Sequence, residues 1–149
     1  MFVKEGHDTM SIRLFYPDPG SGLALPAVGH ISAGFPSPAD DYLEAVLDLN
    51  DLLIKNPSAT FYGTVKGNSM QDAGVEDGDL LVIDKAVPYR PNALAICYLD
   101  GEFTLKRLRK EGEHLYLMPA NPRYQPIRVR EGSDFAVWGI VTYIIKKVY

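Results

Sequence analysis

The pattern of hydrophobic and polar positions changes at the turn signal Asn56-Pro57-Ser58. Beyond it, apolar residues alternate with polar ones or form short runs bounded by turn residues, which is typical of β-strands. The dipeptide Asp100-Gly101 separates two such segments and is a strong hairpin signal. We therefore expect about six or seven strands, at residues 60–65, 80–83, 93–99, 102–108, 115–118, 127–129 and 135–145.

Before this turn, the pattern favours a helix. Ser37 can cap a helix and Pro38 suits its first position, while Asp40 and Asp41 favour the positive end of the helix dipole. Apolar residues then recur at helical spacing, namely Tyr42, Leu43, Val46, Leu47 and Leu49. The sequence thus predicts a helix that starts after Ser37, followed by a second apolar cluster at 52–54.

Residues 1–33 differ from the rest of the chain. They are rich in turn-forming residues and show no sustained period, which predicts an extended arm. A first strand near 12–16 followed by a long loop is the alternative that the pattern leaves open. The fold class is predicted as mostly β, with a single compact β domain from about residue 40 and an extended N-terminal arm.

Composition narrows the classes of function. A chain of 149 residues is enough for one domain, and 46% hydrophobic and 23% charged residues are ordinary for a globular protein. The net charge of -4 argues against a broad basic surface that coats nucleic acid. No apolar run approaches the ~18 residues of a membrane helix, and residues 1–6 lack the apolar core of a secretory signal. We expect a cytoplasmic protein without a membrane segment.

Metal and cysteine chemistry find little support in the sequence. His7, His30 and His114 are scattered and never stand at metal-ligand spacing, so we expect neither a metal nor a cofactor. Cys97 is the single cysteine and cannot form an internal disulfide. It lies in an apolar strand and is interpreted as a small buried hydrophobic residue rather than a nucleophile.

The most informative stretch is Lys66-Gly67-Asn68-Ser69-Met70, just past a predicted strand. A serine at such a position exposes its hydroxyl, and adjacent backbone N–H groups can point at one atom, as an oxyanion hole requires. Gly-Asn-Ser is also common in ordinary turns. The residues alone leave both interpretations open.

A serine nucleophile needs a base, and Lys106 is a candidate. With no obvious histidine partner, a neutral lysine can accept the proton, and burial lowers the pKa of a lysine. Alternation along 102–108 puts Lys106 on the same face of its strand as Thr104 and Leu108. A solvated strand lysine is the alternative.

Several ordered blocks resemble the LexA/UmuD family of self-cleaving serine–lysine proteins. They are Gly67-Asn68-Ser69-Met70, residues 77–84 and residues 101–106. Upstream, Ala33-Gly34-Phe35-Pro36 resembles the family's cleavage site, and residues 48–54 and 56–60 resemble the UmuD branch in particular. The resemblance runs from about residue 33 to about residue 145.

This resemblance implies roles for particular residues. Ser69 would be the nucleophile, Lys106 the general base, and the backbone amides of Asn68 and Ser69 the oxyanion donors. The scissile bond would join Ala33 to Gly34, which divides the chain into an arm at 1–33 and a β-rich peptidase and dimerisation domain at 34–149. UmuD proteins commonly have cysteine at the residue before the scissile bond, and the alanine at position 33 of this chain resembles LexA at this position instead.

The resemblance also implies a function in the SOS response to DNA damage. A RecA filament on single-stranded DNA would stimulate the cut, and the processed homodimer would serve an error-prone translesion polymerase with a UmuC-like catalytic subunit. No direct specific DNA binding is expected. A LexA-type repressor is a second reading, but it needs a helix-turn-helix before the cut, where residues 1–33 carry too many prolines. A catalytically silent polymerase-binding module is the third.

Overall fold

The computed structural model describes residues 11–15, 24–28, 34 and 43–149. The expected helix-start residues Ser37, Pro38, Asp40 and Asp41 lie outside the described residues, and so do His7, His30 and Ala33.

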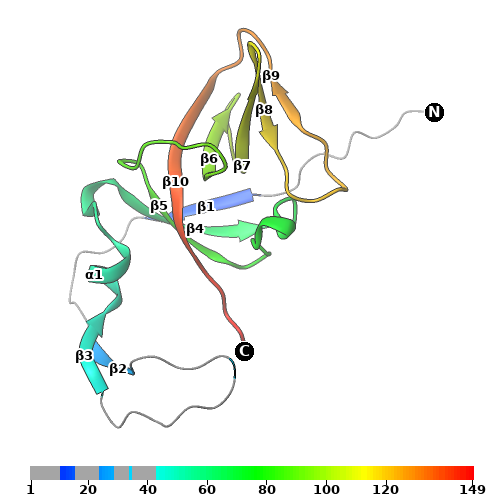
Figure 1. Cartoon of the computed structure of the whole chain (residues 1–149). Helices are drawn as coiled ribbons and strands as arrows, with labels where there is room; N and C mark the ends of the chain where they lie inside the picture. Colours follow the sequence, from blue (N-terminus) through cyan, green and yellow to red (C-terminus); the bar gives the residue numbers. More distant parts are fainter. Residues whose placement is uncertain (1–10, 16–23, 29–33, 35–42) are drawn as a thin grey trace.

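Most of the described chain forms one antiparallel sheet of 8 strands, in the order β1-β4-β5-β10-β6-β7-β8-β9. Figure 1 shows that this sheet curls around its own core. The strands are β1 (Ser11–Phe15), β4 (Thr60–Lys66), β5 (Leu80–Asp84), β6 (Leu94–Leu99), β7 (Glu102–Glu111), β8 (His114–Met118), β9 (Ile127–Val129) and β10 (Phe135–Ile145). Short 3-10 turns lie at Pro57–Ala59 and Gln71–Ala73. The mostly-β prediction is confirmed, and each predicted strand from residue 60 onward has a counterpart.

The expected helix is wrong over residues 43–48. These residues form β3 (Leu43–Asp48), which pairs antiparallel with β2 (Ala24–Val28) in a separate ribbon of 2 strands. A partner strand about twenty residues away in sequence satisfies the backbone hydrogen bonds that a helix would satisfy locally, and local periodicity does not report such a partner. Figure 1 shows this ribbon beside the curled sheet.

A short helix, α1 (Leu49–Leu53), follows β3 directly. Its N-cap is Asp48, whose carboxylate accepts a hydrogen bond from the Asn50 N–H at 2.9 Å. Within the described ranges, no helix is long and apolar enough to cross a membrane.

Part of the predicted arm belongs to the main sheet. β1 pairs with β4, so that Ile12 lies opposite Val65 and Leu14 opposite Gly63. A Cβ on Gly63 would lie 2.9 Å from Cγ2 of Ile12, so the glycine allows the close approach of β1. This strand corresponds to the alternative that the sequence left open for residues 12–16.

The two faces of the central strands pack into two apolar clusters. One contains residues from β4 and the loop after it together with β5, β6 and β7, namely Val65, Met70, Val75, Leu81, Ile83, Ile96 and Leu105. The other contains Ala95, Cys97, Leu117 and Ile140. Because residues directly opposite each other share a face, the pairing of Ala95 with Lys106 places Lys106 on the side of the second cluster.

Two carboxylates at the two ends of β5 are buried. Asp79 is 5% exposed and Asp84 is 4% exposed. Each still serves a turn, because Asp79 accepts from the Glu76 N–H at 2.8 Å and Asp84 from the Ala86 N–H at 2.8 Å. Buried carboxylates need such partners.

Candidate active site at Ser69 and Lys106

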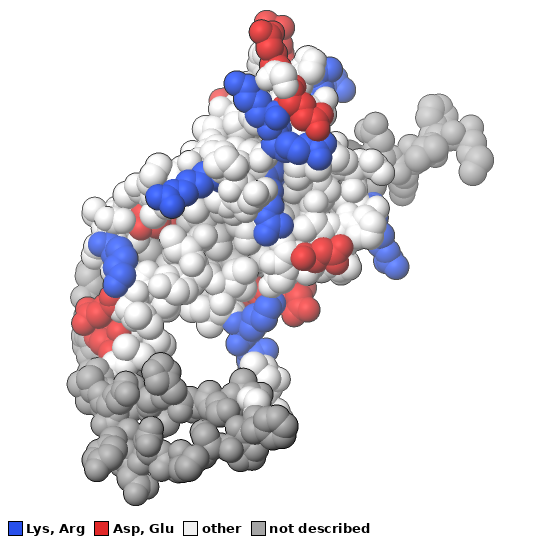
Figure 2. Space-filling view, in the orientation of Figure 1, with Lys and Arg blue, Asp and Glu red and all other residues white. Residues whose placement is uncertain are grey.

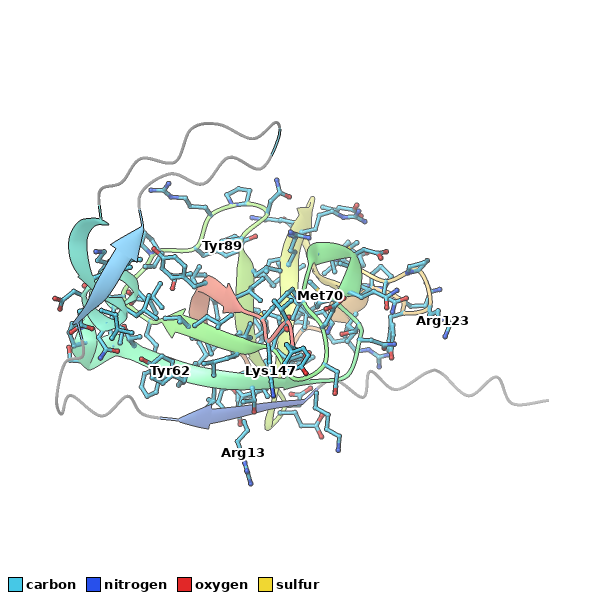
Figure 3. The ribbon with its side chains drawn as sticks, turned by 90° about the horizontal axis from the view of Figure 1, so that it is seen from below. Arg13, Tyr62, Met70, Tyr89, Arg123 and Lys147 are labelled. Atoms are coloured by element: carbon cyan, nitrogen blue, oxygen red, sulfur yellow. The ribbon has the colours of Figure 1, made fainter. Side chains whose placement is uncertain are left out.

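The loop between β4 and β5 carries Ser69. Gly67 opens the loop with φ 103, a left-handed value that glycine adopts without strain, and its N–H donates to Asp77 Oδ1 at 2.8 Å. Met70 and Val75 are fully buried and fix the loop to the core. Figure 3 labels Met70 on this loop, within the body of the molecule. Ser69 therefore lies between a turn that needs glycine and a buried anchor at Met70.

Lys106 reaches the site from the middle of β7. Its neighbour on the same face is Thr104, as the alternation predicted, and the register places Thr104 opposite Cys97 on β6. Lys106 is 0% exposed, so its whole side chain lies inside the protein. The interpretation as a solvated strand lysine is wrong, because curling of the sheet covers this face.

The two side chains meet although 37 positions separate them in sequence. Lys106 Nζ donates to Ser69 Oγ at 3.1 Å, to Thr104 Oγ1 at 3.0 Å and to the Leu105 carbonyl oxygen at 2.9 Å. Ser69 is itself 0% exposed, which corrects the expectation of an exposed hydroxyl. The contact is short enough for direct proton transfer between the hydroxyl and the amine.

Lys106 Nζ lies beside the uncharged oxygens of two hydroxyls and a carbonyl, and burial in general disfavours the charged form of a lysine. Burial also raises the pKa of the nearby Cys97 thiol to about 12, against a smaller opposing effect of the Lys106 charge. The thiol is therefore protonated at neutral pH, which confirms the interpretation of Cys97 as a small buried side chain.

A second segment, residues 119–124 after β8, braces the Ser69 loop, although no sequence pattern indicated it. The Ala120 N–H donates to the Ser69 carbonyl at 2.8 Å, and the Asp72 N–H donates to the Ala120 carbonyl at 2.7 Å. Asn121 Nδ2 donates to the Asn68 carbonyl at 2.9 Å. In sequence, Asn121-Pro122 signals only a turn, so nothing there pointed to Ser69.

The far end of the Ser69 loop is fixed to the end of β10. Lys146 Nζ donates to Asp79 Oδ2 and to Glu76 Oε2. The hydrogen bond to Asp79 is the main cause that raises the pKa of Lys146. These contacts join the C-terminal strand to the loop that carries the serine.

The remaining predicted site residues are placed only in part. Gly34 is exposed, and a Cβ built on it would meet no atom within 4 Å. The Asn68 and Ser69 amides lie in the same loop as the Ser69 hydroxyl. His114 is exposed and its Nδ1 lies 2.9 Å from an Arg128 nitrogen. In the part of the chain that the structure describes, no group of three or more His, Cys, Asp or Glu side chains could hold a metal.

Comparison with known proteins places this site in a family context. The family described as Peptidase S24-like matches residues 26–142, which include both Ser69 and Lys106. Protein SamA of Salmonella typhimurium is 44% identical over 115 residues, which cover 77% of this chain and 79% of SamA. Protein MucA of Escherichia coli is 36% identical over 114 residues, with 76% and 77% covered.

A LexA repressor is also similar. That of Herminiimonas arsenicoxydans is 36% identical over 141 residues, which cover 93% of this chain and 64% of the repressor. A family match over most of the chain, together with relatives of this identity and coverage, shows that the chain belongs to the S24-like peptidase family.

Proposed function

We propose that this chain is a UmuD-type protein that cuts itself between Ala33 and Gly34, with Ser69 as the nucleophile and Lys106 as the general base. The observation that carries the proposal is the contact of 3.1 Å between Lys106 Nζ and Ser69 Oγ, made by two side chains with no exposed surface. A buried lysine can act as a base, because burial lowers its pKa and so favours the neutral amine that accepts a proton.

The proposed reaction has two steps. Ser69 Oγ attacks the Ala33 carbonyl carbon while its proton moves to Lys106 Nζ, and the amides of Asn68 and Ser69 stabilise the oxyanion. The bond between Ala33 and Gly34 then breaks, and the new Gly34 amine takes the proton. Water then attacks the ester carbon and gives a proton to Lys106 Nζ, and that proton passes to Ser69 Oγ as the Ala33 carboxyl group leaves.

The protein carries its own substrate, so self-cleavage depends on regulation more than on affinity for a separate substrate. The cleavage segment is part of the same chain, so its effective concentration near Ser69 is high whenever it docks. We propose that a RecA filament on single-stranded DNA favours the docked state with a neutral Lys106. This makes the cut a response to DNA damage in the cytoplasm.

We further propose that residues 34–149 remain as a homodimer and serve a UmuC-like translesion polymerase. Similarity to SamA and MucA over about three quarters of the chain supports this assignment. Direct specific DNA binding is not part of the proposal. Figure 2 shows acidic and basic side chains mixed on the visible face, without a continuous basic surface.

A LexA-type repressor is the second candidate, favoured by the similarity to LexA over 93% of the chain. A LexA-type repressor needs a helix-turn-helix before the cut, and the described residues 11–15 and 24–28 form the strands β1 and β2 instead. A catalytically silent binding module would keep the fold without the reaction.

The test incubates the full-length protein with RecA, ATP and single-stranded DNA and sequences any new N-terminus. We expect a chain beginning at Gly34 from the wild type and none from Ser69→Ala or Lys106→Ala. Lys110→Ala is the matched control, because Lys110 lies on the same strand with an exposed side chain and should leave cleavage unchanged. Cleavage of either dyad variant at wild-type rate would overturn the assignment, and an intact wild type would favour the silent module.

A further inference from the structure

We propose that Asn121 is a positioning residue that orients the peptide between Asn68 and Ser69 and thereby directs the Ser69 N–H at the reacting carbonyl oxygen. The inference rests on the proposed function, in which this N–H is an oxyanion donor. It adds a residue from a different part of the chain, in the segment after β8.

The orientation of the Asn121 side chain is determined by its partners. Asn121 is 4% exposed, and its Oδ1 accepts from the Arg123 N–H at 3.0 Å. A backbone N–H can only donate, so Oδ1 must face Arg123, and Nδ2 must face the Asn68 carbonyl 2.9 Å away. Both ends of the amide are therefore used, and a flipped side chain would lose both hydrogen bonds. In Figure 3, Arg123 lies at the outer edge of the molecule, so its side chain extends away while its backbone holds Asn121.

The hydrogen bond to the Asn68 carbonyl fixes more than one atom. In a planar trans peptide the carbonyl and the following N–H point in opposite directions, so holding the Asn68 oxygen also sets the direction of the Ser69 N–H. The Gln71 N–H donates to the same oxygen at 3.2 Å. The next peptide is held as well, because the Ser69 carbonyl accepts from Ala120 at 2.8 Å. Two consecutive peptide planes at the nucleophile are thus held by residues 120 and 121.

Preorganisation of this kind matters because an oxyanion donor contributes fully only when it needs no reorientation during the reaction. A purely structural role for Asn121 predicts a different behaviour, in which its removal lowers stability without a specific effect on the chemical step. The two roles can be separated, since Tyr124 provides a comparison. Its hydroxyl donates to Asn68 Oδ1 at 2.7 Å, so it contacts the Asn68 side chain but not the peptide group.

The experiment measures self-cleavage of the full-length chain without an activator, as a function of pH. Asn121→Ser is the main variant, because a hydroxyl can still cap the turn at Arg123 but is too short to replace Nδ2 at the Asn68 carbonyl. Asn121→Asp keeps the size and the turn acceptor and serves as a second variant if Asn121→Ser unfolds at the assay temperature. Tyr124→Phe is the matched control, and thermal unfolding is followed for every chain.

We expect Asn121→Ser to lower the plateau rate at least about 10-fold, since loss of one oxyanion donor costs on the order of 10²–10³ in rate. The pH at half-maximal rate should not move, because the base is unchanged, and Tyr124→Phe should stay within about 3-fold of wild type. A plateau rate for Asn121→Ser equal to that of Tyr124→Phe, or a shifted pH midpoint with an unchanged plateau, would overturn the positioning role. A wild-type chain that is never cut at Gly34 would instead refute the proposed function itself.

Discussion

The proposed base can be tested through the stability of the fold as well as through its chemistry. Lys106 is fully buried in the folded protein, whereas in the unfolded chain a lysine has the reference pKa of ~10.4. If its pKa in the folded protein is lower, the unfolded chain binds more protons than the folded chain between the two values. Stability then rises with pH across that window. Replacing the lysine by methionine, which is similar in length and cannot ionise, should abolish this contribution.

The magnitude follows from linkage. Each pH unit between the two pKa values contributes about 1.4 kcal/mol to the free energy of unfolding, so two units give about 2.7 kcal/mol. Below the folded-state value the full cost of burying the ammonium is present, and above ~10.4 it is gone. Cys97 does not affect the difference in stability between the lysine and methionine chains. Its thiol has a pKa of about 12 in the folded protein and therefore stays protonated up to pH 10, and in the two unfolded chains it ionises to the same extent.

The assay is urea denaturation at several pH values between neutral and about pH 10, with and without Lys106→Met. Both chains carry Gly34→Glu to prevent self-cleavage, a change that a freely exposed position accommodates. The difference in stability between the two chains should be flat at first and then rise by about 1.4 kcal/mol per unit. The rise should begin at the same pH at which the activator-free cleavage rate of the wild type levels off. Parallel stability curves up to pH 10, or a rise that begins far from the kinetic midpoint, would refute a neutral Lys106 as the base.

Further predictions concern the groups around the site. Gly34→Glu should block the cut and leave the midpoint of thermal unfolding unchanged, and efficient cleavage at the same bond would contradict the cut-site assignment. Cys97 should resist alkylation by iodoacetamide at pH 8 in the folded protein and react readily in urea, because burial raises its pKa to about 12; equal labelling rates would show an accessible thiolate. Gly139→Ala should destabilise the fold by about 1–3 kcal/mol, because its Cβ would lie 2.6 Å from Ile83 Cγ2, and an unchanged melting temperature would contradict this packing. Lys146→Met should lower the melting temperature at low salt and less so at high salt. Since the pKa of Lys146 is raised in the folded protein, its contribution to stability is complete below pH ~10.4 and disappears only as the pH rises through the folded-state pKa.

The strands of the main sheet could be predicted because their signals are local. Alternation along β7 and the turn at Asp100-Gly101 depend only on neighbouring residues, and Asp100 and Gly101 do adopt positive φ values of 47 and 90. The same alternation correctly placed Lys106 beside Thr104. What it could not show is that this face is covered, because burial depends on how distant strands curl together.

The errors have the same origin. Residues 43–48 have helical spacing, yet pairing with β2 determines their structure. Asp79 accepts from the Glu76 N–H in its own turn and is also the partner of Lys146, 67 positions later. Asn121 carried no sign of its role, since its contact with Asn68 spans 53 positions. Each of these features is a contact between segments that local patterns treat separately.

The burial of Lys106 is itself an argument for chemistry rather than stability. An apolar side chain of similar length at this position would pack against Ala95 and Cys97 without the cost of desolvating an amine. The printed hydrogen bonds of Lys106 reach the hydroxyls of Ser69 and Thr104 and a carbonyl oxygen, and even a well-formed buried ion pair often contributes no more than an apolar replacement. Exposed positions for lysine are plentiful on the same strand, as Lys110 shows. A lysine held in the interior, with its amine 3.1 Å from a serine hydroxyl, therefore supports the proposed role of Lys106 as the base.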